Sequence, residues 1–195
     1  MTEENRVALV TAGTGELGLA VARRLKADGL RVAVLDRPDP ISKAIAEHND
    51  LVFVGAEPGQ VEGMQAAVEE VARVFGGLDV LVHAAGGDGA RAQALGCLAW
   101  PQLTRRAGGR LIGVVEAPKQ AWDDAAPPGL GEPVRAQALA GAPHGLTVNA
   151  ICLVGPETGR PEPEEVAALV GYLVSPAGRA MTGAWLVLSG PAPGE

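Results

Sequence analysis

The sequence predicts an α/β fold with a doubly wound parallel sheet, and three observations support this prediction. Short apolar runs alternate with segments that carry apolar residues at helical spacing. A glycine-rich loop follows the first apolar run. Hydrophobic residues make up 47% of the chain but aromatic residues only 3%, so Val, Leu and Ala must form the core. This composition is typical of strands that are buried on both faces between helices.

The first half of the chain is predicted to hold four strands and three helices. The strands are short apolar runs rich in β-branched residues, and the helices carry one apolar face. The predicted strands are 6–11, 31–36, 51–54 and 78–82. The predicted helices are 17–27, 41–47 and 61–75. Glycine can adopt the left-handed conformation that ends a helix, so Gly29 and the pair Gly76–Gly77 mark two helix ends.

The second half continues the alternation, with one irregular stretch. The predicted helices are 90–106, interrupted by Pro101, then 134–142 and 163–174. The predicted strands are 110–115, 146–153 and 184–188. Residues 117–133 include four prolines and are expected to form an irregular connection. No repeat or linker divides the chain, which predicts one domain over residues 1–195.

Size and charge restrict the class of protein. A 195-residue chain can bury a sizeable core without disulfides or a metal, so Cys97 and Cys152 are expected to be buried thiols in a reducing compartment. The net charge of -7, without a basic cluster, argues against nucleic acid as a partner. The polar, acidic start is unlike a signal peptide, and no apolar run is long enough to span a bilayer. We therefore expect a cytoplasmic protein with no membrane partner.

The glycine-rich loop is a candidate dinucleotide site. Gly13, Gly15 and Gly18 form a Gly-x-Gly-x-x-Gly pattern between a predicted strand and a predicted helix, as in Rossmann-type folds. Asp36 ends the next strand, where a carboxylate accepts hydrogen bonds from a ribose 2′-hydroxyl and repels a 2′-phosphate. This favours NAD over NADP. Glu16, however, adds a carboxylate to the turn that would face the phosphates. The alternative is that the glycines only allow the helix to pack against the strand.

Five ordered segments resemble the short-chain dehydrogenase/reductase family, nearly from end to end. They are 10–18, 78–86, 109–115, 145–152 and 181–190. The first is similar to the family's glycine-rich loop, with Ala12 in place of the first glycine, and the second is similar to its Leu-Asp-Val-Leu-Val-Asn-Asn-Ala-Gly segment. The resemblance implies a reduced form of that Rossmann-type fold with NAD as the cofactor. The implied cofactor-binding residues are Gly13, Gly15, Gly18, Asp36, Ala85 and Gly86.

The residues that perform the family's reaction are missing from this sequence. The family uses a Ser-Tyr-Lys set whose tyrosine exchanges a proton with the substrate oxygen, but this chain has no Tyr-x-x-x-Lys. Its only tyrosine, Tyr172, matches an apolar packing position of the family, and Glu116 stands where the serine belongs. Gly86 and Gly109 are too close in sequence for the family's long helix. The helix after Thr158 begins too soon to leave room for the lobe that covers the substrate.

Other polar residues offer weaker candidates. Glu116 and Lys119, near Asp123 and Asp124, could perform acid–base catalysis, but a solvated loop is the alternative explanation for this charge cluster. His83 follows a buried strand and is expected to be structural. The histidines and cysteines do not have metal-ligand spacing, so no metal site is predicted.

We therefore expect a catalytically degenerate member of this family that acts as a structural or regulatory partner subunit, with weak or lost NAD binding. The expected assembly is a homodimer or a hetero-oligomer with a complete family member, formed through the last helix and strand. An apolar stripe on that helix is the candidate interface, although part of it must cover the chain's own sheet: Val166, Leu169, Val170 and Leu173. The alternative is an atypical NAD-dependent oxidoreductase, or a non-redox enzyme that reuses the cofactor pocket.

Overall fold

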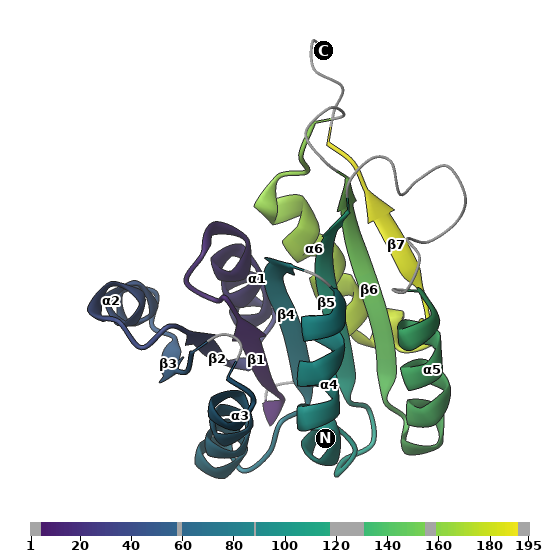
Figure 1. Cartoon of the computed structure of the whole chain (residues 1–195), viewed down its shortest axis with the longest axis horizontal. Coiled ribbons are helices and arrows are strands. Elements are labelled where there is room, and N and C mark those ends of the chain that lie inside the picture. Colours follow the sequence, from purple (N-terminus) through teal and green to yellow (C-terminus); the bar gives the residue numbers. More distant parts are fainter. Residues whose placement is uncertain (1–4, 58–59, 88, 118–130, 155–158, 191–195) are drawn as a thin grey trace.

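The computed structural model describes residues 5–57, 60–87, 89–117, 131–154 and 159–190. Within these ranges seven strands form one parallel sheet in the order β3-β2-β1-β4-β5-β6-β7. The order reverses between β1 and β4, which is the switch point of a Rossmann-type fold. The predicted fold class is therefore confirmed (Figure 1).

The elements alternate along the chain, as the sequence predicts. The strands are β1 (Val7–Thr11), β2 (Arg31–Asp36), β3 (Val52–Gly55), β4 (Val80–Gly87), β5 (Arg110–Ala117), β6 (Thr147–Val154) and β7 (Trp185–Leu188). The helices are α1 (Glu16–Ala27), α2 (Pro40–His48), α3 (Val61–Phe75), α4 (Gly89–Leu103), α5 (Gly131–Gly141) and α6 (Pro163–Val174).

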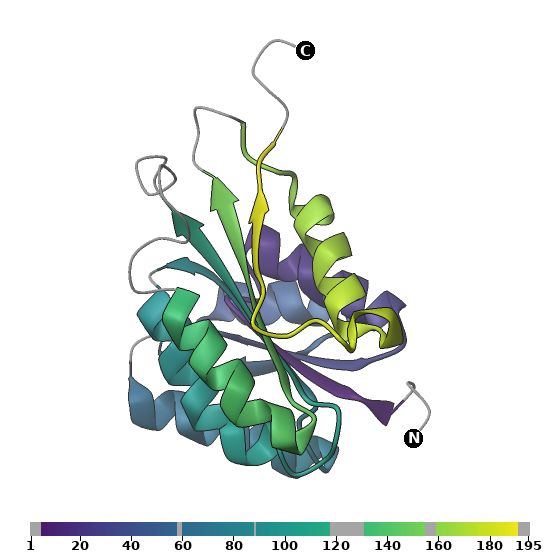
Figure 2. The same ribbon diagram turned by 90° about the vertical axis from the view of Figure 1, so that its right-hand side faces the viewer.

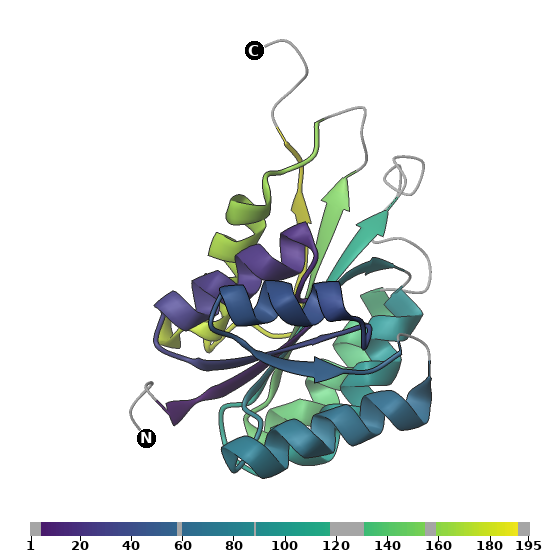
Figure 3. The same cartoon turned by 90° about the vertical axis from the view of Figure 1, so that its left-hand side faces the viewer.

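The helices cover both faces of the sheet and create two cores. Helices α1, α2 and α6 lie on one face, and α3, α4 and α5 lie on the other (Figures 2 and 3). Val10 and Val82 face the first core, while Leu9 and Leu81 face the second. Neighbouring residues of one strand point to opposite faces, so strands buried on both sides must be apolar throughout. This explains the continuous Val, Leu and Ala runs.

The largest differences from the sequence prediction concern β4, α4 and α5, while the ends of the other elements differ by at most two residues. Strand β4 continues to Gly87 rather than ending at residue 82. Pro101 lies inside α4 without interrupting it, because the helix ends only two residues later and the buried Ala99 and Leu103 hold it against the core. Part of the expected irregular connection is helical, since α5 begins at Gly131. Residues 118–130 lie outside the described ranges.

The expectation of two buried thiols is wrong for one of them. Cys152 is buried in β6, but Cys97 is exposed on α4. Helix α4 buries Leu95, Ala99 and Leu103 against the sheet. Cys97 lies two residues from both Leu95 and Ala99, so its direction around the helix takes it away from that face.

The apolar stripe on α6 is not a free surface. Val166, Val170 and Leu173 each have 0% exposed surface, and Leu169 packs partly buried against the same core. Helix α6 turns these side chains toward the sheet and α1. The prediction of an intermolecular interface through this stripe is therefore wrong, because the chain's own core already covers it.

No helix in the described part of the chain is long and apolar enough to cross a membrane.

Candidate cofactor cleft

The glycine-rich loop connects β1 to α1, and two of its glycines are required by packing. A Cβ on Gly13 would lie 2.5 Å from Cβ of Val34, and a Cβ on Gly18 would lie 2.1 Å from the carbonyl oxygen of Ala12. Both distances are shorter than atoms can approach. The packing interpretation of the glycines thus explains Gly13 and Gly18. Gly15 is different, because it is exposed at the N-cap of α1 and a Cβ there would be in ordinary contact.

The start of α1 faces the position where a phosphate would bind. No side chain caps this helix at Gly15, so the first backbone N–H groups and the positive end of the helix dipole are available to an anion. Glu16 is the first residue of α1 and places a carboxylate at the same end. A pyrophosphate would meet this negative charge.

Asp36 ends β2 beside the glycine-rich loop, as expected, and is already hydrogen bonded. Its Oδ2 accepts hydrogen bonds from the backbone N–H of Thr14 at 3.1 Å and from the Thr14 hydroxyl at 2.6 Å. Its Oδ1 accepts one from the backbone N–H of Arg37 at 2.9 Å. A ribose hydroxyl would have to compete with Thr14 for this carboxylate. Thr14 is therefore a further site residue that was not predicted, although a threonine inside the loop was a visible signal.

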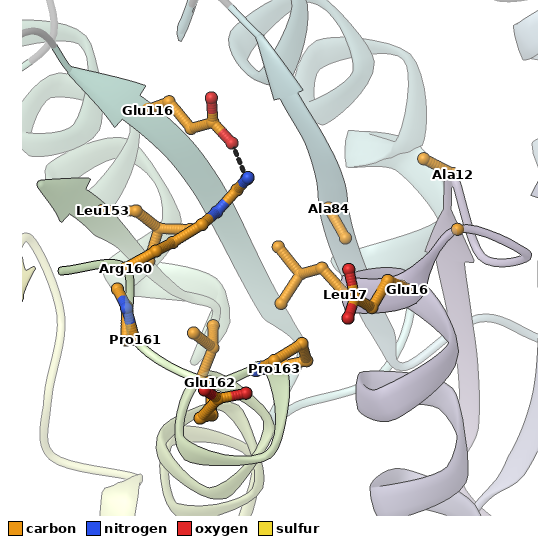
Figure 4. A pocket seen from close by; sticks show the side chains of 13 residues that line it. Ala12, Glu16, Leu17, Ala84, Glu116, Leu153, Arg160, Pro161, Glu162 and Pro163 are labelled. Carbon is orange, nitrogen blue, oxygen red and sulfur yellow. Dashed lines mark hydrogen bonds and ion pairs between the residues drawn. The ribbon is translucent and has the colours of Figure 1, made fainter. Parts of the chain in front are cut away.

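A cleft of about 420 Å³ opens at the carboxyl ends of the strands, between the starts of α1 and α6 (Figure 4). Parallel α/β sheets bind their ligands at this edge. The apolar part of the lining includes Leu17, Ala84 and Leu153. Of the candidate residues, Gly15, Gly18 and Glu116 line the cleft, whereas Gly13 and Asp36 do not. The backbone of Ala85 and Gly86 continues β4 beyond Ala84.

The charged part of the lining is mainly acidic. Among the described residues of the lining, Glu16, Glu116 and Glu162 contribute three carboxylates and Arg160 contributes a guanidinium. Arg160 comes from the segment before α6, and its Nη2 donates to Oε1 of Glu116 at the end of β5. The side chains of Arg160 and Glu116 are 65% and 46% exposed. Nothing in the sequence indicated that Arg160 would reach Glu116.

These residues fit only part of a dinucleotide. Asp36 suits a ribose diol, and the start of α1 offers N–H donors. The three carboxylates oppose a pyrophosphate, which carries negative charge of its own. The phosphate-bearing part of NAD therefore does not fit the charges that line this cleft.

Of the remaining candidates, His83 lies within the described residues. It is buried on β4, and its Nδ1 lies 2.8 Å from the hydroxyl of Thr11 on β1, which agrees with the expected structural role. Lys119, Asp123 and Asp124 lie outside the described residues. Within the described ranges, no group of three His, Cys, Asp or Glu side chains could hold a metal ion.

Tyr172 lies at the opposite end of the molecule from the cleft. It lines a separate hollow of about 340 Å³ with Arg6, Leu30 and Val174, at the edge where β1 and β2 begin. The tyrosine is 44% exposed, so the expected packing position is wrong: α6 directs this side chain outward from the core. Its phenol cannot reach a ligand in the cleft at the carboxyl ends of the strands.

Known proteins resemble this chain in sequence and in fold. L-2,3-butanediol dehydrogenase of Corynebacterium glutamicum is 35% identical over 89 residues, which cover 42% of this chain and 34% of that protein. Cis-1,2-dihydrobenzene-1,2-diol dehydrogenase of Pseudomonas putida is 43% identical over 89 residues, covering 44% and 32%. The matched region thus spans about a third of the length of these curated relatives.

The solved structure described as gox2181 has a TM-score of 0.80 at 22% identity, covering 95% of this chain and 96% of that one. A dehydrogenase/reductase from Sinorhizobium meliloti 1021 has a TM-score of 0.78 at 23% identity, covering 98% of both. At this identity the two structures support the fold alone. The sequence profile of the family described as short chain dehydrogenase matches residues 6–105, just over half of the chain. The chain therefore belongs to the short chain dehydrogenase family.

Proposed function

We propose that this chain is a catalytically degenerate short-chain dehydrogenase that serves as a structural or regulatory partner subunit, with weak or lost NAD binding. The observation that carries the proposal is the position of Tyr172. It is the one tyrosine in the sequence, and it lies at the edge of the sheet away from the cleft. A family member without a phenol in the cleft lacks the proton donor of the family's reaction.

The cleft supports weak rather than tight NAD binding. Asp36 disfavours the 2′-phosphate of NADP, so NAD is the preferred dinucleotide. Glu16 lowers the affinity for either dinucleotide, because its carboxylate occupies the end of α1 where a pyrophosphate would accept N–H hydrogen bonds. We expect Asp36→Ala to weaken NAD binding further.

The partner-subunit role is supported by what the fold retains. The sheet is complete to β7, and the α6 helix that precedes β7 is well packed. With the apolar stripe of α6 buried, the exposed residues Tyr172 and Val187 remain as the contact candidates on the C-terminal helix and strand. The partner is a second copy of this chain or a complete family member.

A second candidate function is an atypical NAD-dependent oxidoreductase, or a non-redox enzyme that reuses the cleft. Glu116 favours it, because its carboxylate lines the cleft at the end of β5 and could exchange a proton. The relatives described as dehydrogenases also favour it.

Two measurements on the purified protein test the proposal. We expect no useful rate of NADH oxidation with carbonyl compounds or of NAD reduction with secondary alcohols, since a positioned general acid–base contributes roughly 10²- to 10⁴-fold to the rate. Calorimetric titration should give weak binding of NAD and still weaker binding of NADP. Robust turnover that Glu116→Gln abolishes would establish the enzyme alternative, and tight NADP binding would contradict the role given to Asp36.

A further inference from the structure

Among the described residues that line the cleft, Arg160 is the cation. Its side chain extends from the segment before α6 across to Glu116 at the end of β5 (Figure 4). The two residues are 44 positions apart in the sequence, so only the fold brings them together. Their ion pair connects the segment before α6 to the end of β5, and both residues line the cleft.

The ion pair lies in one particular half of the ligand crevice. In a doubly wound sheet, each half of a dinucleotide lies over one half of the sheet, and the pyrophosphate lies at the start of the first helix between them. Asp36 belongs to the half formed by β1, β2 and β3. Glu116 belongs to the half formed by β4, β5 and β6. Arg160 therefore occupies space in the second mononucleotide half, away from Glu16.

The backbone that carries Arg160 is held in place. The backbone N–H of Gly190 donates to the carbonyl oxygen of Gly159 at 3.1 Å, and Pro161 is buried. Gly190 also packs so closely that a Cβ there would lie 2.5 Å from the carbonyl oxygen of Arg160. Only the exposed side chain of Arg160 is free to leave Glu116.

We propose that the Arg160 side chain, while it is paired with Glu116, fills the second mononucleotide half of the cleft. A ligand that binds in this half must displace it. This inference rests on the proposed function, in which NAD binding is weak, and adds a second obstacle that is separate from Glu16. Both side chains are substantially exposed, so their pair contributes little stability and a ligand can displace it.

Once Arg160 is removed, the charge of Glu116 determines which ligand this half of the cleft prefers. The carboxylate of Glu116 then remains at the end of β5 without its guanidinium. A planar cation is the complementary group, and the ring of oxidised nicotinamide is planar and positively charged. The opened cleft should therefore prefer oxidised nicotinamide nucleotides to reduced ones.

Calorimetric titrations with AMP and with oxidised and reduced nicotinamide mononucleotide test this proposal. The titrations compare Arg160→Ala with the unchanged protein, each also in a Glu16→Gln background that lowers the charge at the phosphate end. We expect Arg160→Ala to bind oxidised nicotinamide mononucleotide about fivefold more tightly, the upper range for losing an exposed ion pair, and to leave AMP binding unchanged. Glu16→Gln alone should improve binding of all three nucleotides.

Two variants serve as controls. Arg179→Ala removes an exposed arginine outside the cleft lining and controls for net charge. The double variant Arg160→Ala/Glu116→Gln should keep the opened cleft but lose the preference for the oxidised ring. If Arg160→Ala lowers thermal stability, Arg160→Gln replaces it, because this side chain keeps most of the length and loses the charge.

The outcomes distinguish the proposed role of Arg160 from the weak NAD binding of the proposed function. Equal gains for AMP and both forms of nicotinamide mononucleotide, or no gain with Arg160→Ala in either background, would overturn the role of Arg160. Micromolar NAD binding by the unchanged protein, or no effect of Glu16→Gln on any nucleotide, would instead contradict the weak cofactor binding in the proposed function.

Discussion

At the scale of the residue, Ala12 holds a backbone conformation that suits glycine. Its φ is 50°, in the left-handed region where a Cβ crowds the following carbonyl. Ala12 also stands where the family's glycine-rich loop begins with glycine. The loop therefore holds an alanine in a conformation that glycine adopts more easily.

We expect Ala12→Gly to raise the free energy of unfolding by about 1 kcal/mol, because the relief of left-handed strain exceeds the added freedom of the unfolded chain. Denaturant unfolding measures the change. Ala66→Gly is the matched control, since Ala66 is exposed inside α3 and glycine there should destabilise by about 1 kcal/mol. A loss of stability in both variants would show that Ala12 is not strained.

The two cysteines differ in exposure, which predicts that they differ in reactivity. Burial raises the pKa of the Cys152 thiol to about 11, so at neutral pH it is protonated and enclosed. Cys97 is exposed on α4. We expect one thiol per chain to react rapidly with a thiol reagent in the folded protein, and the second only after unfolding. Cys97→Ser should abolish the rapid phase, whereas a rapid phase that survives this change would place Cys152 at the surface.

At the scale of the element, α2 depends on a single N-cap residue. Oδ1 of Asp39 accepts hydrogen bonds from the backbone N–H groups of Ile41 and Ser42, both at 2.9 Å, and Oδ2 accepts one from the Ser42 hydroxyl at 2.8 Å. The hydrogen bonds from Ser42 lower the pKa of Asp39 below 3.8. The charged carboxylate is therefore the form that stabilises the helix.

This lowered pKa gives a pH-dependent prediction. A carboxyl group whose pKa is lower in the folded state stabilises the fold above its unfolded pKa, and the stabilisation is lost as the pH falls through the folded pKa. We expect the unchanged protein to have a higher free energy of unfolding than Asp39→Asn. This difference should be largest at pH 7 and should decrease below pH 3.8.

Denaturant unfolding of a double-mutant cycle with Ser42→Ala measures this coupling at each pH. The coupling between Asp39 and Ser42 should decrease together with the stability advantage. A coupling that is equal at pH 7 and pH 3 would show that the charge of Asp39 has no part in capping α2.

At the scale of the whole molecule, the sheet of the described residues ends at β3 and β7, and each of these strands has an exposed valine. Val52 on β3 is 43% exposed and Val187 on β7 is 48% exposed. Unpaired edge strands are surfaces on which other chains can add. The proposed partner contact uses the β7 edge, so the β3 edge provides an internal comparison.

We expect Val187→Asp to lower the assembled fraction measured by light scattering, because a charge opposes burial of this edge, and Val52→Asp to leave it unchanged. Circular dichroism of both variants establishes that the fold is retained. A monomeric unchanged protein that also recovers no family member in a pull-down would refute the partner-subunit role.

The sequence by itself determined the alternation of strands and helices, because hydrophobic periodicity is a local property of the chain. It predicted β2, α3 and α6 with their observed ends, and it placed Gly13 and Gly15 in the turn before α1 and Gly18 in the first turn of that helix. These features depend on residues that are neighbours in the sequence. The doubly wound sheet follows from their order.

Only the tertiary structure decided the character of the cleft. Asp36 and Thr14 are 22 residues apart, and Glu116 and Arg160 are 44 apart, so no local pattern links either pair. Sheet order and helix packing bring each pair together. The same packing buries the α6 stripe and directs Tyr172 outward, since helical spacing shows that an apolar face exists but not which surface covers it.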